Sequence, residues 1–263
     1  MAKTIAISNQ KGGVAKTTTC VSLGACFAEL GHPTLLIDLD PQASLSVAVG
    51  FHDDNSETTI TDLLETQLNP KSLDHSSLIK KTTFPGLDVI LSDARLWTVE
   101  RLLSDQMDYE RILGRELEQV AGPYEYVIID CSPSLGPLTI MALTASEHVI
   151  IPTQTEYLAA FGLMRLLETV DAIHEHTNPE LSYNLLAVLY DQRTAICREV
   201  LDRLKINFKD HIFETVIGID TRLRECVVNG EPIIQYDTKT RASQQYRQLA
   251  LEYIQKTELR EKP

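Results

Sequence analysis

The chain has 263 residues, 43% of them hydrophobic, which is enough to bury one substantial core in a single α/β domain spanning residues 1–263. It contains no run of 18 or more apolar residues, and its start lacks the apolar stretch of a secretion signal, so we expect a cytoplasmic protein with no membrane partner. Its formal net charge of −13 argues against nucleic-acid binding through an evenly basic surface.

Short apolar runs rich in Val and Ile recur along the chain, and helical patterns lie between several of them. The runs are nearly continuous rather than alternating, as is typical of strands buried on both faces of a parallel sheet. The expected strands are residues 4–8, 34–38, 87–91, 126–130, 148–152 and 185–190, and the expected helices are residues 17–30, 99–117, 158–173 and 242–259. Residues 52–81 are polar and weakly periodic, and we assign no element there. The alternation predicts a doubly wound, mostly parallel α/β sheet with helices on both faces.

A glycine-rich loop follows the first expected strand and leads directly into the first expected helix. Glycines allow a tight loop whose N–H groups point inward, and a helix N-terminus adds partial positive charge where phosphates bind. Lys16 can reach the β- and γ-phosphates of a nucleotide, and the Thr17 hydroxyl is placed to ligate Mg²⁺. The predicted phosphate-binding residues are Lys11, Gly12, Gly13, Val14, Ala15, Lys16, Thr17 and Thr18.

Acidic residues end two of the expected strands. Asp38 and Asp40 lie at the end of the second strand, where Asp40 can orient the attacking water or accept its proton and Asp38 can contact the metal shell. Spacing leaves open which of the two matters more to hydrolysis. Asp130 ends a later apolar strand and is interpreted as the Walker B acid that holds Mg²⁺ through water.

The loop departs from the strict P-loop pattern, because Gln10 and Ala15 occupy its two glycine positions. Its Lys-Gly-Gly-x-x-Lys-Thr sequence resembles the deviant Walker A loop of the ParA/MinD/nitrogenase iron protein superfamily of P-loop NTPases. Further segments resemble ParA and Soj sequences: Asp-x-Asp-Pro-Gln at 38–42, the turn after Asp130 with Ser132 in place of a proline, and residues 151–159, 189–194 and 236–241. The resemblance implies that Lys11 is a signature lysine, which in an ATP-bound homodimer reaches the partner subunit's phosphates.

The family resemblance implies an ATPase that uses Mg²⁺, binds non-specific DNA as a dimer and associates with the nucleoid. A partner adaptor protein would stimulate its hydrolysis, and the cargo would be a plasmid, a chromosome or a protein compartment such as a carboxysome. By position, the adenine wall is expected at Tyr190, Ile217 and Gly218. Residues 217–227 depart from the corresponding Soj stretch, which favours an orphan cargo-positioning type.

Basic residues are concentrated late in the chain, where residues 193–263 hold 13 Lys and Arg against 11 Asp and Glu, compared with 11 against 26 in residues 1–192. Such a region can supply the phosphate contacts of non-specific DNA binding. The predicted DNA-binding residues are Arg193, Arg203, Lys205, Lys209, Arg222 and Arg224.

Other functions remain open. The main rival is a metabolic P-loop enzyme of related fold, such as a dethiobiotin synthetase-like ligase or a metal-cluster carrier, which has no need of DNA. A filament-forming structural ATPase is a third possibility. A nitrogenase-type cluster is rejected, because residues 87–130 contain no second cysteine to accompany Cys131. A MinD-type membrane helix is also rejected, because residues 253–263 mix charges of both signs.

Overall fold

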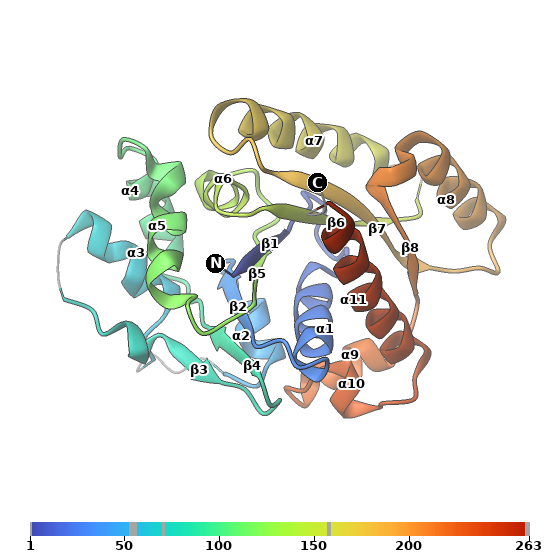
Figure 1. Cartoon of the computed structure of the whole chain (residues 1–263), viewed down its shortest axis with the longest axis horizontal. Helices are drawn as coiled ribbons and strands as arrows, with labels where there is room; N and C mark the ends of the chain where they lie inside the picture. The colour runs from blue at the N-terminus through green and yellow to red at the C-terminus, as the bar shows by residue number, and fades with distance from the viewer. Residues whose placement is uncertain (1, 53–56, 70–71, 157–158, 261–263) are drawn as a thin grey trace.

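The structure is a computed structural model that describes residues 2–52, 57–69, 72–156 and 159–260. In this part of the chain eight strands form one sheet in the order β3-β4-β2-β5-β1-β6-β7-β8, which runs across the molecule between two layers of helices (Figure 1). Only β3 is antiparallel to its neighbour. The strands are β1 (Lys3–Ile7), β2 (Thr34–Leu39), β3 (Ile79–Lys81), β4 (Leu87–Ile90), β5 (Tyr126–Cys131), β6 (His148–Gln154), β7 (Ser182–Tyr190) and β8 (Ile212–Gly218). The predicted doubly wound, mostly parallel sheet is confirmed.

Each face of the sheet is covered by helices, so the chain has one hydrophobic core on each side. One layer consists of α1 (Lys16–Glu29), α2 (Ser44–Ala48), α9 (Arg222–Val228), α10 (Ile233–Tyr236) and α11 (Arg241–Arg260). The other consists of α3 (Ile60–Leu68), α4 (Leu96–Leu103), α5 (Ile112–Val120), α6 (Pro137–Thr144), α7 (Ala159–His176) and α8 (Ala195–Phe208). Successive strand residues alternate between the cores: Ile128 packs on the α1 side, and its neighbours Val127 and Ile129 pack on the α3 side. This double burial explains the continuous apolar runs.

The predicted helix over residues 99–117 is wrong, because two shorter helices occupy this region. α4 ends at Leu103, a 3₁₀ turn covers Tyr109–Arg111, and α5 begins at Ile112. Asp108, immediately before that turn, has a φ of 55°, in the left-handed region that Asp tolerates better than most residues. The polar segment 104–108 therefore interrupts the helical path.

The region 52–81, to which no element was assigned, contains α3, a 3₁₀ turn at His75–Ser77 and β3. α3 begins with a capping box, in which Thr59 accepts a hydrogen bond from the Thr61 N–H and Asp62 accepts one from the Thr59 N–H. The predicted helix 158–173 is observed as α7, and Leu158 lies outside the described residues. No helix in the described ranges is long and apolar enough to cross a membrane.

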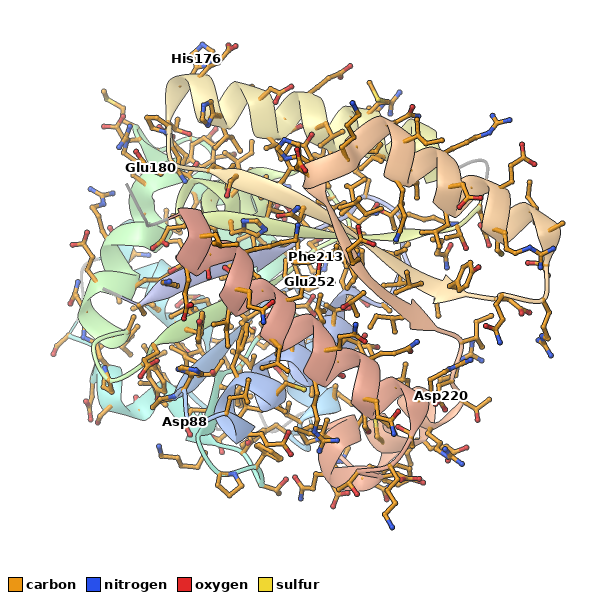
Figure 2. The ribbon with its side chains drawn as sticks, turned by 45° about the vertical axis from the view of Figure 1, so that its right-hand side comes forward. Asp88, His176, Glu180, Phe213, Asp220 and Glu252 are labelled. Atoms are coloured by element: carbon orange, nitrogen blue, oxygen red, sulfur yellow. The ribbon has the colours of Figure 1, made fainter. Side chains whose placement is uncertain are left out.

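The C-terminal helix α11 covers β8, the last strand of the sheet. Its residues Tyr246 and Leu249 are fully buried. The Glu252 carboxylate accepts hydrogen bonds from the main-chain N–H groups of Glu214 (2.7 Å) and Thr215 (2.9 Å), and Figure 2 shows Glu252 on this helix close to Phe213 of β8. The helix thus satisfies edge-strand donors that would otherwise be free to pair with another chain.

Two glycines hold α2 in place beneath the sheet edge. Gly50 follows α2 with a φ of 93°, and Gly230 lies between α9 and α10 with a φ of 65°. A Cβ atom on Gly230 would lie 2.5 Å from the Gly50 Cα and 2.8 Å from the Gly50 N, so the two backbones touch. Only glycine fits at this contact, which fixes the position of α2 against the α9–α10 turn.

We therefore expect Gly230→Ala to lower the free energy of unfolding by about 2–4 kcal/mol, through both the left-handed φ and the backbone clash. Gly31→Ala is the matched control, because Gly31 also has a positive φ (91°) but no atom lies within 4 Å of an added Cβ. It should cost only about 1–2 kcal/mol. Urea denaturation measures both losses, and equal losses would contradict the proposed contact.

Candidate functional site

The predicted phosphate loop and acidic residues meet at the carboxyl ends of the central strands. In the sheet, Asp130 of β5 lies in register with Asp38 of β2 on one side and with Ile7 of β1 on the other. The loop that follows β1 therefore lies beside both acids. In open α/β sheets this edge is where ligands bind.

The phosphate loop has an open, left-handed conformation. Gly13 has a φ of 74°, and Cβ atoms added to Gly12 or Gly13 would meet nothing within 4 Å, so this part of the loop borders free space. Ala15 has a φ of 59° at the N-cap of α1, which an alanine adopts at a cost of about 1–2 kcal/mol. This is one of the positions where the strict pattern has glycine, and the backbone here explains that preference. Val14 is 1% exposed and packs inward.

Lys16 is the buried cation of the site. It begins α1, is 8% exposed, and its ammonium donates to the Lys11 carbonyl at 3.4 Å. The start of the loop is tied to β6 through Asn9, which accepts from the Lys11 N–H at 2.9 Å and donates to the Pro152 carbonyl at 2.7 Å. The start of the loop is thus fixed against β6.

Asp130 and Thr17 form the polar pair at the base of the loop. The Thr17 hydroxyl donates to Asp130 Oδ2 at 2.6 Å, and Asp130 is 1% exposed. Its Oδ1 accepts no hydrogen bond from the described residues, although the buried Cys20 thiol lies near the carboxylate. Burial, and then the charge of Asp38, raise the pKa of Asp130 to about 8, which Thr17 and Lys16 only partly oppose.

These oxygens suit a magnesium ion. The Thr17 hydroxyl and the Asp130 oxygen that has no hydrogen-bond partner among the described residues are oxygen ligands of the kind Mg²⁺ prefers, and Lys16 lies nearby for the triphosphate. No group of three or more His, Cys, Asp or Glu that could hold a metal occurs in the described ranges. The Thr17 hydroxyl and the Asp130 carboxylate fit an ion that completes its shell with phosphate oxygens and water.

Asp38 and Asp40 differ in how much of their carboxylate is free. Asp38 is fully buried, and its Oδ2 accepts from both the N–H and the hydroxyl of Ser46 at 2.8 Å. Burial raises its pKa to about 6, against the lowering effect of these bonds. Asp40 is half-buried, and one of its oxygens accepts from the Gln42 N–H at 3.0 Å. The geometry favours Asp40 as the carboxylate open to water and Asp38 as the anchor of α2.

Lys11 points toward its own subunit. Its ammonium donates to Glu156 Oε2 at 2.7 Å and to the Gln154 side chain. Neither Gln154 nor Glu156 is among the site residues predicted from the sequence. The available signal was their position directly after a buried strand, within the family-like segment 151–159, of which Tyr157 and Leu158 lie outside the described residues.

The three predicted adenine-wall residues lie at the ends of β7 and β8, on the same edge of the sheet as the loop. Tyr190 pairs with Gly218 across these strands. Ile217 is 1% exposed in the core, so only its main chain can face a ligand. Arg241, not singled out from the sequence, covers Gly218: a Cβ there would lie 2.9 Å from the Arg241 Cζ. Its guanidinium also donates to the Ile219 carbonyl.

The predicted DNA-binding residues are divided between the two layers of helices. Those from 193 to 209 lie on or next to α8, in the layer that covers the α3 side of the sheet, whereas Arg222 and Arg224 lie on α9 in the opposite layer (Figure 1). Four have acidic partners within one subunit: Arg193–Asp191 at 2.8 Å, Arg203–Glu199 at 2.6 Å, Lys205–Glu214 at 2.5 Å and Arg222–Asp237 at 3.6 Å.

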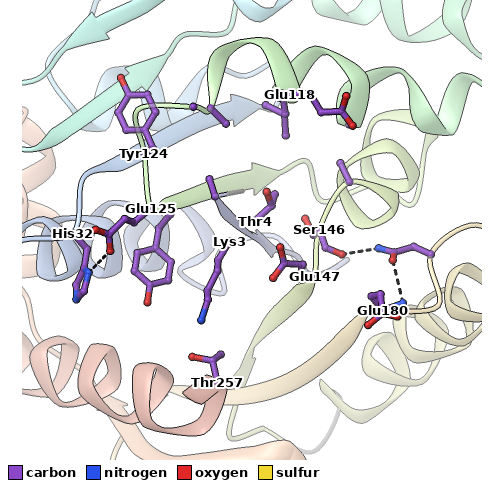
Figure 3. A pocket seen from close by; sticks show the side chains of 18 of the residues that line it. Lys3, Thr4, His32, Glu118, Tyr124, Glu125, Ser146, Glu147, Glu180 and Thr257 are labelled. Carbon is purple, nitrogen blue, oxygen red and sulfur yellow. Dashed lines mark hydrogen bonds and ion pairs between the residues drawn. The ribbon is translucent and has the colours of Figure 1, made fainter. Parts of the chain in front are cut away.

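A cavity of about 900 Å³ lies at the opposite edge of the sheet, by the amino ends of the central strands (Figure 3). Its lining includes Lys3 of β1, Tyr126 of β5 and the glutamates Glu118, Glu125 and Glu147. It is separated from the phosphate loop by the length of the strands. Its acidic walls would repel a nucleotide.

Comparison with known proteins places this site in a family. Residues 2–183 match the family described as AAA domain. The chain is similar to the sporulation initiation inhibitor protein Soj of Bacillus subtilis, with 43% identity over 253 residues, 96% of this chain and 98% of that protein. It is also similar to the chromosome partitioning protein ParA of Caulobacter vibrioides, with 38% identity over 96% of this chain and 94% of that protein.

One solved structure of related sequence is that of a protein named as a metabolic enzyme. This is cobyrinic acid a,c-diamide synthase from Mycobacterium smegmatis with a bound ATP analogue and magnesium. It superposes with a TM-score of 0.78 at 33% identity and covers 95% of this chain and 93% of that chain. The shared fold therefore does not by itself separate partition proteins from metabolic ones.

The buried acids make the ligand-free protein sensitive to pH. An acid with a raised pKa keeps its proton in the folded chain but loses it in the unfolded chain, so stability falls as pH rises from about 4 to the folded pKa. For Asp130 that window extends to about pH 8. Between pH 6 and 8.5 the wild type should lose about 1–3 kcal/mol more than Asp130→Asn, whose amide cannot ionise. Thermal unfolding without nucleotide or magnesium measures the difference, and parallel pH curves would refute it.

Proposed function

Because this chain belongs to the Soj/ParA family of partition ATPases, we propose that it binds and hydrolyses ATP with Mg²⁺ between two copies of itself. The ATP-bound dimer binds DNA of the nucleoid without sequence specificity, and it releases the DNA when an adaptor protein stimulates ATP hydrolysis. The observation that carries the proposal is the open glycine loop that places Lys16 and the Thr17–Asp130 pair at one strand edge. The Soj and ParA relatives, which match this chain over nearly their whole length, support the same proposal.

Each residue of the site has a definite task in this proposal. Lys16 and the loop amides bind the phosphates, and Thr17 and Asp130 hold Mg²⁺, which when bound neutralises phosphate charge as the β–γ bond breaks. Asp40 orients the attacking water. Lys11 contributes from the partner subunit, adding a cation where negative charge develops, as an arginine finger does.

The distribution of basic residues fits a DNA-binding state that depends on dimer formation. One subunit carries its candidate residues in two separate layers, and most of them are neutralised by nearby acids. Two subunits joined at the nucleotide edge bring together sets that one subunit keeps apart. Contacts of this kind bind DNA phosphates without reading sequence.

Two observations bear on the identity of the cargo, and they favour different answers. The relative named as a chromosome partitioning protein favours a chromosome or plasmid. Residues 217–227, at the end of β8 and in α9, differ from the corresponding Soj stretch. This difference favours an orphan cargo-positioning ATPase, whose cargo would be a protein compartment such as a carboxysome. In either case the adaptor that stimulates hydrolysis is a separate partner protein.

The metabolic alternative has one observation in its favour, the likeness to the M. smegmatis diamide synthase. Such an enzyme, like a dethiobiotin synthetase-like ligase or a metal-cluster carrier, uses ATP on a small substrate. The partition proposal is preferred because the Soj and ParA relatives are more similar in sequence, at 43% and 38% identity against 33%. Filter binding with random duplex DNA separates the two, since only a partition ATPase retains DNA when ATP is added.

The pair of changes Arg222→Glu and Arg224→Glu should abolish ATP-dependent retention of DNA while ATP binding survives, because both residues are exposed on α9 outside the phosphate loop. The matched control is Arg101→Glu with Arg115→Glu on α4 and α5, which changes the net charge equally. The control should keep most of its DNA retention. Equal retention by both double variants would refute the assignment to α9.

A further inference from the structure

Lys11 is held at both ends by its own subunit. Its carbonyl accepts from Lys16 at 3.4 Å, and its ammonium contacts the Glu156 carboxylate at 2.7 Å together with the Gln154 side chain. Gln154 also donates to the Gly13 carbonyl at 3.4 Å, so the end of β6 contacts the phosphate loop twice. The contact arises from the sheet itself, because β6 lies directly beside β1.

We propose that Glu156 and Gln154 are positioning residues for Lys11, which keep its ammonium on its own subunit until the phosphates of a partner subunit compete for it. This inference rests on the proposed function, in which Lys11 acts across the dimer. Within one subunit the Lys11 ammonium lies 2.7 Å from the Glu156 carboxylate. In the proposed dimer a partner's phosphates attract the same ammonium, so the phosphates and Glu156 compete for its position.

The ion pair between Lys11 and Glu156 is strong enough to disfavour dimer formation but too weak to prevent it. The Lys11 and Glu156 side chains are 40% and 61% exposed, so water and salt screen their attraction. Exposed pairs of this kind change an equilibrium by about two- to fivefold. A triphosphate carries several negative charges, whereas Glu156 carries one. The Lys11 ammonium is therefore attracted more strongly to a partner's triphosphate than to Glu156 once two subunits meet. The pair thus raises the concentration of ATP-bound protein needed to form dimers.

The test compares dimer formation by wild type and Glu156→Gln with saturating Mg²⁺ and ATP, using sedimentation equilibrium. The glutamine keeps the size of the side chain and removes its charge, so the variant should form dimers at an about two- to fivefold lower protein concentration. The shift should shrink at high salt. Glu180→Gln, an exposed glutamate at the far edge of the sheet (Figure 2), is the matched control and should give no shift.

A second pair of variants distinguishes positioning of Lys11 from simple repulsion of phosphate by Glu156. In a Lys11→Ala background, Glu156→Gln should have no further effect, because the lysine that it holds is gone. Unchanged or weaker dimerisation of Glu156→Gln, or the same shift in the Lys11→Ala background, would overturn the inference. Wild-type protein that binds Mg²⁺ and ATP but stays monomeric would instead overturn the proposed function, and the inference with it.

Discussion

Two carboxylates, Asp38 and Asp130, lie side by side and buried at the carboxyl ends of neighbouring strands. A buried charge is costly unless hydrogen bonds or a counter-ion compensate it. Asp38 has its compensation in Ser46, which ties α2 to the sheet edge. Among the described residues, Asp130 has Thr17 and the nearby Lys16, which oppose its charge only in part. The need for a cation here is the constraint on which the rest of the site depends.

The surrounding fold supports that arrangement. The backbone contact between Gly50 and Gly230 fixes α2, which carries Ser46 to Asp38. β6, on the other side of β1, ties down the phosphate loop through Asn9 and Gln154 and holds Lys11. The site is thus rigid where it holds acids and adjustable where a lysine on its surface can exchange partners. That combination suits a protein whose state is set by its nucleotide.

Much of the fold could be predicted from the sequence, because strands buried on both faces leave continuous apolar runs and the phosphate loop has a fixed place after β1. The prediction of one long helix over 99–117 was wrong because a turn around Asp108 interrupts an otherwise helical pattern. The partners of key residues were harder to predict: Glu156 is 145 positions from Lys11 and Asp130 is 113 from Thr17, and only the strand order brings them together. The separation of the basic residues into two layers likewise depends on which face each helix covers.

The central claim, that the loop and the buried acids form a site for Mg²⁺ and triphosphate, is tested most directly by calorimetric titration with Mg²⁺ and ATP. We expect saturable binding by the wild type and an affinity at least about tenfold lower for Lys16→Ala, since a charge-assisted hydrogen bond to phosphate contributes about 1.5–3 kcal/mol. Lys80→Ala, whose lysine pairs with Glu57 away from the loop, should bind as the wild type does. No measurable binding by the wild type, or equal affinity after Lys16→Ala, would contradict the account.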